Sequence, residues 1–362
     1  MLAVICEEVG ERVMVEEVTL SPVGDNDVLV KTEASGVCHT DLSMVKGYSG
    51  QAMPMVLGHE GTGTVVEIGR HVTRCKPGDR VIVSWAPTCG VCWHCVRHEA
   101  QHCDLFSSIH GRHTVLRKDG SRAAMMAGLG TFSEMMLISE LSVVPIKTEL
   151  PAEQLAMIGC GVTTGVGAAL WTAEVKPGST VAVFGLGGVG LSVIQGARIA
   201  GAARIFGIDP LVGKRNIAES FGATDLIDPE EGDVVEQLIA ATDGRGVDYS
   251  FEVVGQASIA LQAFNAVRRR GTAVVVGMPK FDALLQLPLT PLFFMEKRLI
   301  GSLYGSVQIR EHFPLLVEFA EKGMLDLEAM ISRRISLASV NDAFSAMESG
   351  EVIRSVILPG LR

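Results

Sequence analysis

The sequence predicts an α/β protein with two parts, one rich in β-strands and one built on a doubly wound parallel sheet. Two observations predict this division. Before residue 160, short β-branched runs are separated by glycine and proline, whereas after Trp171 strand and helix patterns alternate. This alternation is typical of βαβ units, in which helices connect parallel strands.

The expected elements follow from these patterns. In the first part, β-branched clusters predict strands at 28–32, 63–68, 80–84 and 143–146. In the second part, strands are expected at 180–184, 204–208, 247–253 and 272–276, and helices at 189–200, 214–221 and 257–267. Amphipathic helices follow at 312–322 and 340–349, and linkers are expected near 160–167 and 299–305.

Composition restricts the class of protein. The chain has 362 residues, enough for two or three domains, and a net charge of −10, which argues against nucleic-acid binding. The N-terminus lacks the basic and apolar regions of a signal peptide, and no apolar run approaches the roughly 18 residues of a membrane span. We therefore expect a cytoplasmic enzyme with no membrane or nucleic-acid partner.

Four of the eight cysteines lie within residues 89–103. This spacing suits one tetrahedral Zn²⁺ with four thiolate ligands. Such a site is structural, because no position remains for a substrate. Disulfides are the alternative, but a close thiol cluster in a cytosolic enzyme more often binds a metal. The proposed ligands are Cys89, Cys92, Cys95 and Cys103.

A glycine-rich segment follows the apolar strand at 181–184 and opens a helix, as in dinucleotide-binding folds. Asp209 ends the next strand about 20 residues later, where a carboxylate can accept from a ribose 2′-OH and repel the 2′-phosphate of NADP. NAD is therefore the expected cofactor, and Lys214 could reach the same ribose. The expected pyrophosphate turn comprises Gly185, Gly187, Gly188, Val189 and Gly190.

A second metal site is suggested by Cys38, His59 and Cys160. Two thiolates and one imidazole leave one tetrahedral position open for water or substrate, as in catalytic zinc sites. Spacing alone leaves the alternative open that His59 is a hydrogen-bonded core histidine and Cys160 a small buried residue.

The motifs together resemble the zinc-containing alcohol dehydrogenases of the medium-chain dehydrogenase/reductase superfamily. Segments 38–41, 58–61, 89–103, 159–161 and 185–190, with the tail at 349–354, occur in the family's order. The resemblance implies a GroES-like β-rich catalytic domain at 1–161 and 305–362, and a Rossmann domain at 162–304. It also implies two Zn²⁺ ions per chain and NAD(H).

The resemblance assigns roles around the catalytic zinc. Cys38, His59 and Cys160 are its implied ligands, Asp41 holds the histidine and Glu60 lies near the metal on the far side. Thr40 hydrogen-bonds the alcohol oxygen and passes its proton towards the ribose. The zinc lowers the pKa of the alcohol, and a hydride then moves to NAD⁺.

Other implied contacts involve the cofactor. Thr164 packs on the nicotinamide, and the backbone near Met278 and Tyr304 holds its carboxamide. The chain departs from many family members at two positions. Ser43 stands where they carry a histidine that ends the proton relay, and His39 stands where they carry an arginine that meets the pyrophosphate. Arg354 remains as one fixed cation.

The substrate is constrained by a further departure. The glutathione-dependent formaldehyde dehydrogenases resemble this chain, but Ser107 stands where they carry a binding arginine, and no acidic residue lies between Lys46 and Leu57. We expect a medium or bulky primary alcohol, aromatic or allylic, in an apolar pocket. A thiol adduct of formaldehyde and a non-catalytic NAD- and zinc-binding protein are the alternatives. The expected pocket residues are Ser43, Met53, Trp85, Met278 and Leu303.

The apolar segment 287–295 lies between expected strands at 272–278 and 299–304. It is too apolar for an exposed loop, and a patch of that size usually marks an interface. In dimeric relatives the matching strands pair across a two-fold axis. We predict a homodimer, with a tetramer built from such dimers or a segment folded onto its own domain as alternatives.

Overall fold

The computed structural model describes residues 1–48 and 51–361. The chain divides into two compact units, Met1–Gly161 with Gln308–Arg362, and Val162–Val307. The first unit therefore contains both ends of the chain, and its C-terminal segment begins three residues after the start of the domain expected at 305–362. Each unit has its own sheets and core, and each is described separately below.

The first unit contains two β-sheets. One is a closed barrel in the order β1-β2-β7-β8-β4, and the other has seven strands in the order β10-β6-β5-β3-β18-β17, with β9 paired to β3. The barrel strands are β1 (Leu2–Cys6), β2 (Met14–Leu20), β4 (Met55–Val56), β7 (Thr114–Arg117) and β8 (Arg122–Met125). The others are β3 (Asp27–Gly36), β5 (Glu60–Ile68), β6 (Arg80–Val83), β9 (Met135–Ser139), β10 (Val143–Pro145), β17 (Ile331–Ile335) and β18 (Arg354–Ile357).

The strand pairing in this unit positions two important segments. β3 and β5 pair antiparallel over their whole length, and the pairing brings Gly36 opposite Glu60. Both strands are longer than the expected 28–32 and 63–68, because β3 extends to Gly36 and β5 begins at Glu60. Most of the extra residues are glycine, alanine, serine or acidic residues, which lack the β-branched signal on which the expectation relied.

Helices of the first unit pack around the ends of these sheets. They are α1 (His39–Val45), α2 (Phe106–His110), α3 (Ala152–Ile158), α10 (Ile309–Glu321) and α11 (Val340–Glu348). Short 3-10 turns are η1 (Cys95–Arg97), η2 (Ala100–His102), η3 (Met126–Gly128), η4 (Glu140–Ser142), η7 (Glu328–Met330) and η8 (Leu337–Ser339). α10 and α11 lie close to the expected 312–322 and 340–349.

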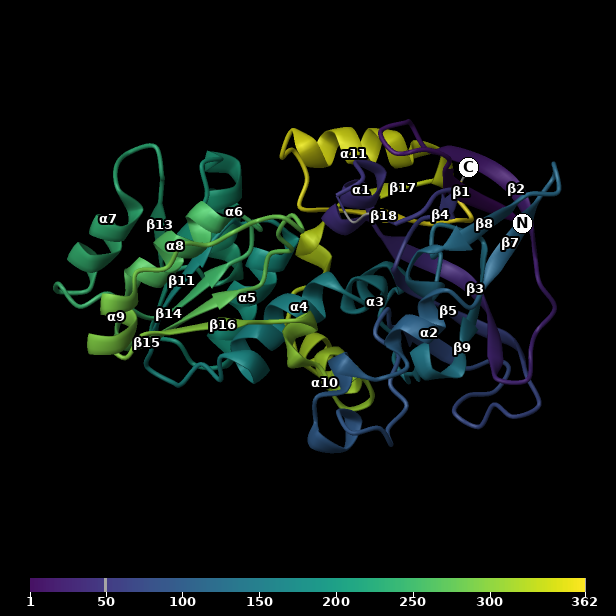
Figure 1. The fold of residues 1–362 in the computed structure, drawn as a ribbon, viewed down its shortest axis with the longest axis horizontal. Coiled ribbons are helices and arrows are strands. Elements are labelled where there is room, and N and C mark those ends of the chain that lie inside the picture. Colours follow the sequence, from purple (N-terminus) through teal and green to yellow (C-terminus); the bar gives the residue numbers. More distant parts are fainter. Residues whose placement is uncertain (49–50, 362) are drawn as a thin grey trace. The chain divides into compact units, whose positions relative to one another are not determined.

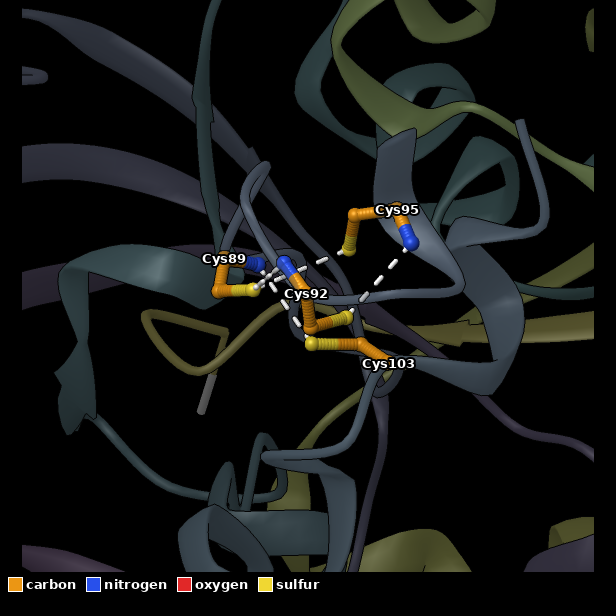
Figure 2. Close-up of side chains that lie close together, drawn as sticks. All are labelled: Cys89, Cys92, Cys95 and Cys103. Carbon is orange, nitrogen blue, oxygen red and sulfur yellow. Dashed lines mark hydrogen bonds between the residues drawn. The ribbon is translucent and has the colours of Figure 1, made fainter. Parts of the chain in front are cut away.

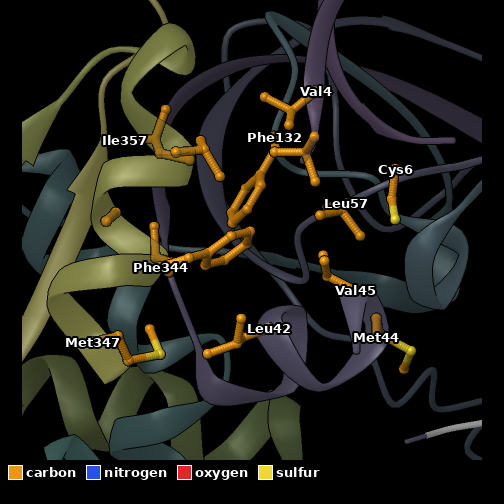
Figure 3. Close-up of a cluster of buried hydrophobic side chains, with 14 of the residues drawn as sticks. Val4, Cys6, Leu42, Met44, Val45, Leu57, Phe132, Phe344, Met347 and Ile357 are labelled. Atoms are coloured by element: carbon orange, nitrogen blue, oxygen red, sulfur yellow. The ribbon is translucent and has the colours of Figure 1, made fainter. Parts of the chain in front are cut away.

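One apolar cluster of this unit fixes α1. Figure 3 shows Phe344 and Met347 of α11 close to Leu42 of α1, with Phe132 and Leu57 from the surrounding chain. All of these side chains are buried. Burying a large apolar side chain contributes roughly 1.5–3 kcal/mol. The cluster therefore anchors the short helix that follows Cys38.

The second unit is a parallel six-stranded sheet in the order β13-β12-β11-β14-β15-β16. Figure 1 shows its strands in teal and green with helices α5 to α8 around them. The strands are β11 (Thr180–Phe184), β12 (Arg204–Ile208), β13 (Asp225–Ile227), β14 (Val247–Glu252), β15 (Val267–Val275) and β16 (Arg298–Gly301). The helices are α4 (Gly161–Gly167), η5 (Ala168–Thr172), α5 (Gly188–Ile199), α6 (Val212–Phe221), α7 (Val234–Ala241), α8 (Ala257–Ala266), α9 (Leu289–Phe294) and η6 (Tyr304–Ser306).

The order of this sheet reverses direction at β11 and β14, as in doubly wound folds. The predicted fold class is confirmed. The expected strand at 299–304 is wrong in its second half, because β16 ends at Gly301 and the chain turns at Tyr304, whose φ is +54°. No single helix among residues 1–48 and 51–361 has the length and apolar composition to cross a membrane, and only the bent pair α3 and α4–η5 meets those criteria jointly.

Candidate functional site

Cys38, His59 and Cys160 lie together in the first unit, with Glu60 beside them. Their ligand atoms are all within 4.8 Å of one another. Cys38 directly precedes α1, His59 directly precedes β5, and Cys160 follows α3. The β3–β5 pairing and the packing of α3 on both strands therefore bring three distant segments to one point.

The histidine of this cluster is oriented by a buried carboxylate. Asp41 Oδ1 lies 3.1 Å from His59 Nδ1, and Asp41 Oδ2 accepts from the Cys38 amide at 2.8 Å. His59 Nε2 is buried and has no hydrogen-bond partner among the described residues. An imidazole held through one nitrogen, with the other unpartnered between two thiols, fits a zinc ion.

The residues of the cluster shift one another's pKa values. The hydrogen bond with Cys160 lowers the pKa of the Cys38 thiol well below its ordinary value. The same bond and burial raise the pKa of Cys160. Burial disfavours a charged His59, but the Asp41 carboxylate more than offsets this and raises its pKa. The surrounding groups therefore favour the thiolate form of Cys38 and the charged form of His59.

Glu60 and Arg354 form a buried ion pair next to the two thiols. Arg354 Nη2 lies 3.3 Å from Glu60 Oε1, which also accepts from the Gly161 amide at 3.0 Å. Burial raises the pKa of Glu60 to about 7, although Arg354 opposes the shift. A Cβ on Gly161 would lie 1.7 Å from Arg354 Nη2, so glycine is required there.

The four-cysteine segment 89–103 forms a lobe in the first unit. Figure 2 shows its four sulfur atoms converging, and they lie within 4.8 Å of one another. Backbone amides point at the sulfurs: Cys92 N donates to Cys89 Sγ at 3.3 Å, and Cys89 N donates to Cys103 Sγ at 3.4 Å. Sulfurs that accept N–H bonds and converge in this way fit one Zn²⁺ with four thiolates.

The thiols of the lobe differ in environment. Backbone amides, first that of Asp104, lower the pKa of Cys92 to about 6. Burial raises the pKa of Cys95 to about 12. A cation between the four sulfurs would relieve their mutual repulsion as thiolates. All eight cysteines are free thiols, so the disulfide alternative has no support.

The glycine-rich turn of the second unit connects β11 to α5. Gly185 has a φ of +99°, and a Cβ on Gly190 would lie 1.9 Å from the Gly185 carbonyl oxygen. Gly187 caps the helix and has open space at its Cβ position. The turn leaves the amides of Gly188 and Val189 at the helix N-terminus, where a pyrophosphate can bind.

The carboxylate at the end of β12 is next to this turn. Asp209 is 6% exposed, and its two oxygens accept from the amides of Leu186 and Leu211, both at 2.9 Å. Each oxygen retains a further acceptor position. Sequence analysis missed Arg215, whose Nη1 donates to the Asp209 carbonyl at 2.7 Å. The only sign of this contact in the sequence is that Arg215 directly follows Lys214, which was expected to reach the ribose.

Comparison with known families supports the same assignment. Residues 24–148 match the alcohol dehydrogenase GroES-like domain, and residues 188–322 match the zinc-binding dehydrogenase domain. The chain belongs to the zinc-containing alcohol dehydrogenases. The predicted family, enzyme class and zinc and nicotinamide cofactors are thereby confirmed.

Individual relatives in this alcohol dehydrogenase family have names that give different substrates. The chain is 36% identical over 365 residues to the S-(hydroxymethyl)glutathione dehydrogenase of Synechocystis sp., with 98% of each chain covered. The benzyl alcohol dehydrogenase of Acinetobacter calcoaceticus has a TM-score of 0.92 at 28% identity, covering 99% of this chain and 98% of that one. A putative zinc-binding dehydrogenase of Sinorhizobium meliloti bound to NADP has a TM-score of 0.82 at 30% identity, with 99% of both chains covered.

The remaining predicted site residues of this alcohol dehydrogenase fall in both units. In the first unit, Thr40 and Ser43 lie half-buried in α1, and His39 is exposed at its first turn. Trp85 follows β6 and meets Phe106 edge to face at 5.9 Å. The second unit carries the others: Thr164 in α4, the exposed Met278 and Leu303, and the buried Tyr304. A shared pocket between these two sets stays a prediction.

One predicted residue has surroundings that the sequence did not suggest. Arg354 was expected to meet the pyrophosphate as a fixed cation. Its guanidinium is instead enclosed by Glu60 and by the Val37 carbonyl, to which Nη1 donates at 3.1 Å. Contact of Arg354 with a pyrophosphate therefore stays a prediction. The structure shows instead that Arg354 lies close to Cys38 and Cys160.

Proposed function

We propose that this dehydrogenase interconverts a bulky primary alcohol, aromatic or allylic, and its aldehyde with NAD. The observation that carries the proposal is the cluster of Cys38, His59 and Cys160, which offers three donors to one metal and keeps His59 Nε2 unpartnered. Three protein ligands leave a fourth tetrahedral position for the alcohol oxygen. A non-catalytic binding protein has no need for that open position.

The chain's own residues would orient the reactants. Zinc supplies a Lewis acid for the alcohol oxygen and NAD⁺ supplies the hydride acceptor. Thr40 Oγ1 lies 3.7 Å from Cys38 Sγ, so with zinc bound its hydroxyl could accept the alcohol proton while passing its own proton on. Asp41 fixes the tautomer of His59 through Nδ1. Ser43 cannot serve as a base, so we propose that protons leave through Thr40, the ribose and water.

We propose that Asp209 selects NAD over NADP. Its carboxylate ends β12 beside the glycine-rich turn, where it can accept from a ribose 2′-OH. Asp209→Asn removes the negative charge and keeps one acceptor oxygen of the two that serve the Leu186 and Leu211 amides. Loss of a charge-assisted hydrogen bond of about 1.5–3 kcal/mol should weaken NAD⁺ binding about 10- to 100-fold and improve NADP⁺ relatively.

The cofactor test compares kcat/KM for the two nucleotides. Glu219→Gln is the control, because Glu219 is exposed on α6, the helix that follows Asp209, and has no proposed ribose contact. An unchanged preference ratio in Asp209→Asn would show that Asp209 does not face the ribose.

Two substrate classes compete. An aromatic alcohol is favoured by the structural similarity to benzyl alcohol dehydrogenase and by Ser107, which stands where glutathione-dependent enzymes carry an arginine. The S-(hydroxymethyl)glutathione dehydrogenases among the relatives favour a thiol adduct of formaldehyde. We favour the aromatic alcohol, because a glutathione adduct carries two carboxylates that Ser107 cannot pair.

Steady-state rates with free NAD⁺ would decide between these substrates. The panel contains benzyl alcohol, cinnamyl alcohol, ethanol, and formaldehyde with and without glutathione. We expect the highest kcat/KM for the aromatic or allylic alcohols. A higher value for formaldehyde with glutathione than for any free alcohol would establish the alternative, and Ser107→Arg should then raise that activity further.

We also propose a homodimer formed through the edge of the six-stranded sheet. β16 is the last strand and pairs only with β15 among the described strands. The neighbouring segment exposes Phe281 by 85%, Leu284 by 86% and Phe293 by 76%. An apolar surface beside an open sheet edge invites pairing with a second copy. A tetramer would contain the same contact twice.

Light scattering at micromolar concentration tests this assembly. Phe293→Glu with Phe294→Ser should shift the mass towards a monomer, and Val91→Ser, at another exposed apolar position, is the control. A monomer mass for the active, unmodified enzyme would contradict the dimer.

The free thiols of both clusters suit a reducing compartment, so we propose a cytoplasmic location.

A further inference from the structure

Two arginines outside both metal clusters reach the base of the four-cysteine lobe. Arg310, the second residue of α10, donates from Nη2 to the Thr88 carbonyl at 3.0 Å. Arg74, in the turn after β5, donates from Nη2 to the Cys89 carbonyl at 3.4 Å. The two carbonyls are consecutive in the chain, and Cys89 is the first cysteine of the lobe. Two cations from separate segments thus meet at the point where the lobe begins.

Arg310 also links this point to the neighbouring sheet. Its Nη1 donates to the Val143 carbonyl at 3.3 Å, and Nη2 lies 3.5 Å from the Leu141 carbonyl. The Thr88 amide donates to the same Leu141 carbonyl at 3.1 Å. One guanidinium therefore joins α10, the start of β10 and the segment that carries Cys89.

The charge of Arg310 has no close carboxylate partner. Its half-buried guanidinium forms no ion pair within 4.0 Å among the described residues, and the carboxylate whose charge acts on it, Glu140, lies 3.9 Å from Arg74 instead. The group is surrounded by carbonyl oxygens, and burial lowers its pKa to about 10, so it stays charged at neutral pH. A half-buried cation of this kind needs negative charge nearby.

The lobe provides that negative charge. Four thiolates with one Zn²⁺ carry a net charge of about −2. Cys95 and Cys103 are both buried, so this charge is poorly screened by water. The charge of Arg74 repels Arg310, whereas the charges of Glu140 and then Cys95 attract it. With Glu140 beside Arg74, the two arginines still leave a net positive charge at the base, opposite in sign to the charge of a loaded lobe.

We propose that Arg310, with Arg74, is a positioning residue pair for the four-cysteine zinc site. The guanidinium groups hold the Thr88 and Cys89 carbonyls, and their charge offsets that of the zinc tetrathiolate. The proposal requires zinc in the lobe but is independent of which alcohol the enzyme uses. It explains why a half-buried arginine at the start of α10 contacts carbonyls rather than a carboxylate.

Release of zinc from the full-length enzyme to an excess of chelator, followed with a colorimetric zinc indicator, tests this inference. Zinc should leave the two sites in separate phases. The phase that belongs to the lobe is identified as the one that is absent in Cys95→Ser. Arg310→Gln keeps donors without charge, Arg310→Lys keeps charge without the fork, and Arg122→Gln, an exposed arginine on β8, is the control. We expect the lobe phase to be about 10-fold faster in Arg310→Gln, with Arg310→Lys nearer the unmodified rate.

Two results would overturn the proposal. One is an unmodified lobe phase in Arg310→Gln, and the other is equal acceleration in Arg310→Gln and Arg310→Lys, which would exclude a contribution from charge. If Arg310→Gln does not fold, Arg74→Gln replaces it. Its lobe phase should then be accelerated less at high salt than at low salt, and an acceleration independent of salt would equally reject the charge role.

Discussion

The four-cysteine lobe takes all its ligands from residues 89–103, whereas Cys38, His59 and Cys160 come from three segments far apart in the chain. The lobe sulfurs accept mainly backbone N–H bonds from within the lobe. The other cluster is surrounded by the side chains of Asp41, Glu60 and Arg354, all buried. The first arrangement completes a coordination shell locally, while the second depends on the packed fold of the whole unit.

This difference indicates how the two sites divide their work. A local loop with four thiolates closes its metal to substrate, and the metal in turn orders a segment with few apolar contacts. A site assembled by strands and helices can hold three ligands rigidly and leave one position open. Buried carboxylates beside the ligands can then tune the charge at that position.

Removing a ligand of the buried cluster should have the largest effect. In Cys38→Ala or Cys160→Ala, turnover should fall by about 1,000-fold or more, because a Lewis acid stabilises the transition state by several kcal/mol. The lobe is unchanged, so one zinc ion per chain should remain, measured by metal analysis. Cys75→Ala removes a buried thiol outside both clusters and should keep both ions and the rate. Near-normal turnover with two zinc ions in Cys38→Ala would contradict the assignment.

Thr40 tests whether the open position lies on the side of α1. Thr40→Ala removes the hydroxyl near Cys38 Sγ without touching a metal ligand. Loss of a positioned proton acceptor should lower kcat about 100-fold, while both zinc ions stay bound. Thr40→Ser retains the hydroxyl and should recover most of the rate. A loss of rate that follows zinc loss would show that Thr40 acts only through the structure of the cluster.

Asp41→Asn should weaken only the buried metal site. The carboxylate orients His59 through Nδ1 and also accepts from the Cys38 amide, and an amide can present a donor to the wrong nitrogen. We expect zinc affinity at this site to fall about 10-fold in competition with a chelator. Asp342→Asn, at an exposed position of α11, is the control. Equal weakening of the lobe zinc would remove the distinction between the two sites.

The same comparison explains what the sequence could predict. The lobe was visible because its four ligands are close in the chain, and the strand, turn and Asp209 of the nucleotide edge were visible for the same reason. The grouping of Cys38, His59 and Cys160 depended on family resemblance, because pairing of β3 with β5 cannot be read from spacing. Arg310 and the enclosure of Arg354 were missed, since each is defined by contacts with segments more than 100 residues away.

Cys95→Ser should have the smallest effect on the reaction and a clear effect on stability. Cys95 is buried in the lobe, which has only a small apolar cluster of its own, so the metal supplies much of its order. A loss of about 2 kcal/mol would lower the melting temperature by about 5 °C, while the initial rate of fresh enzyme stays close to normal. Ser108→Ala, at an exposed position of α2, is the control for handling and purity. A large loss of rate with an unchanged melting temperature would place the lobe in the chemistry, and the division of work between the two clusters would then be wrong.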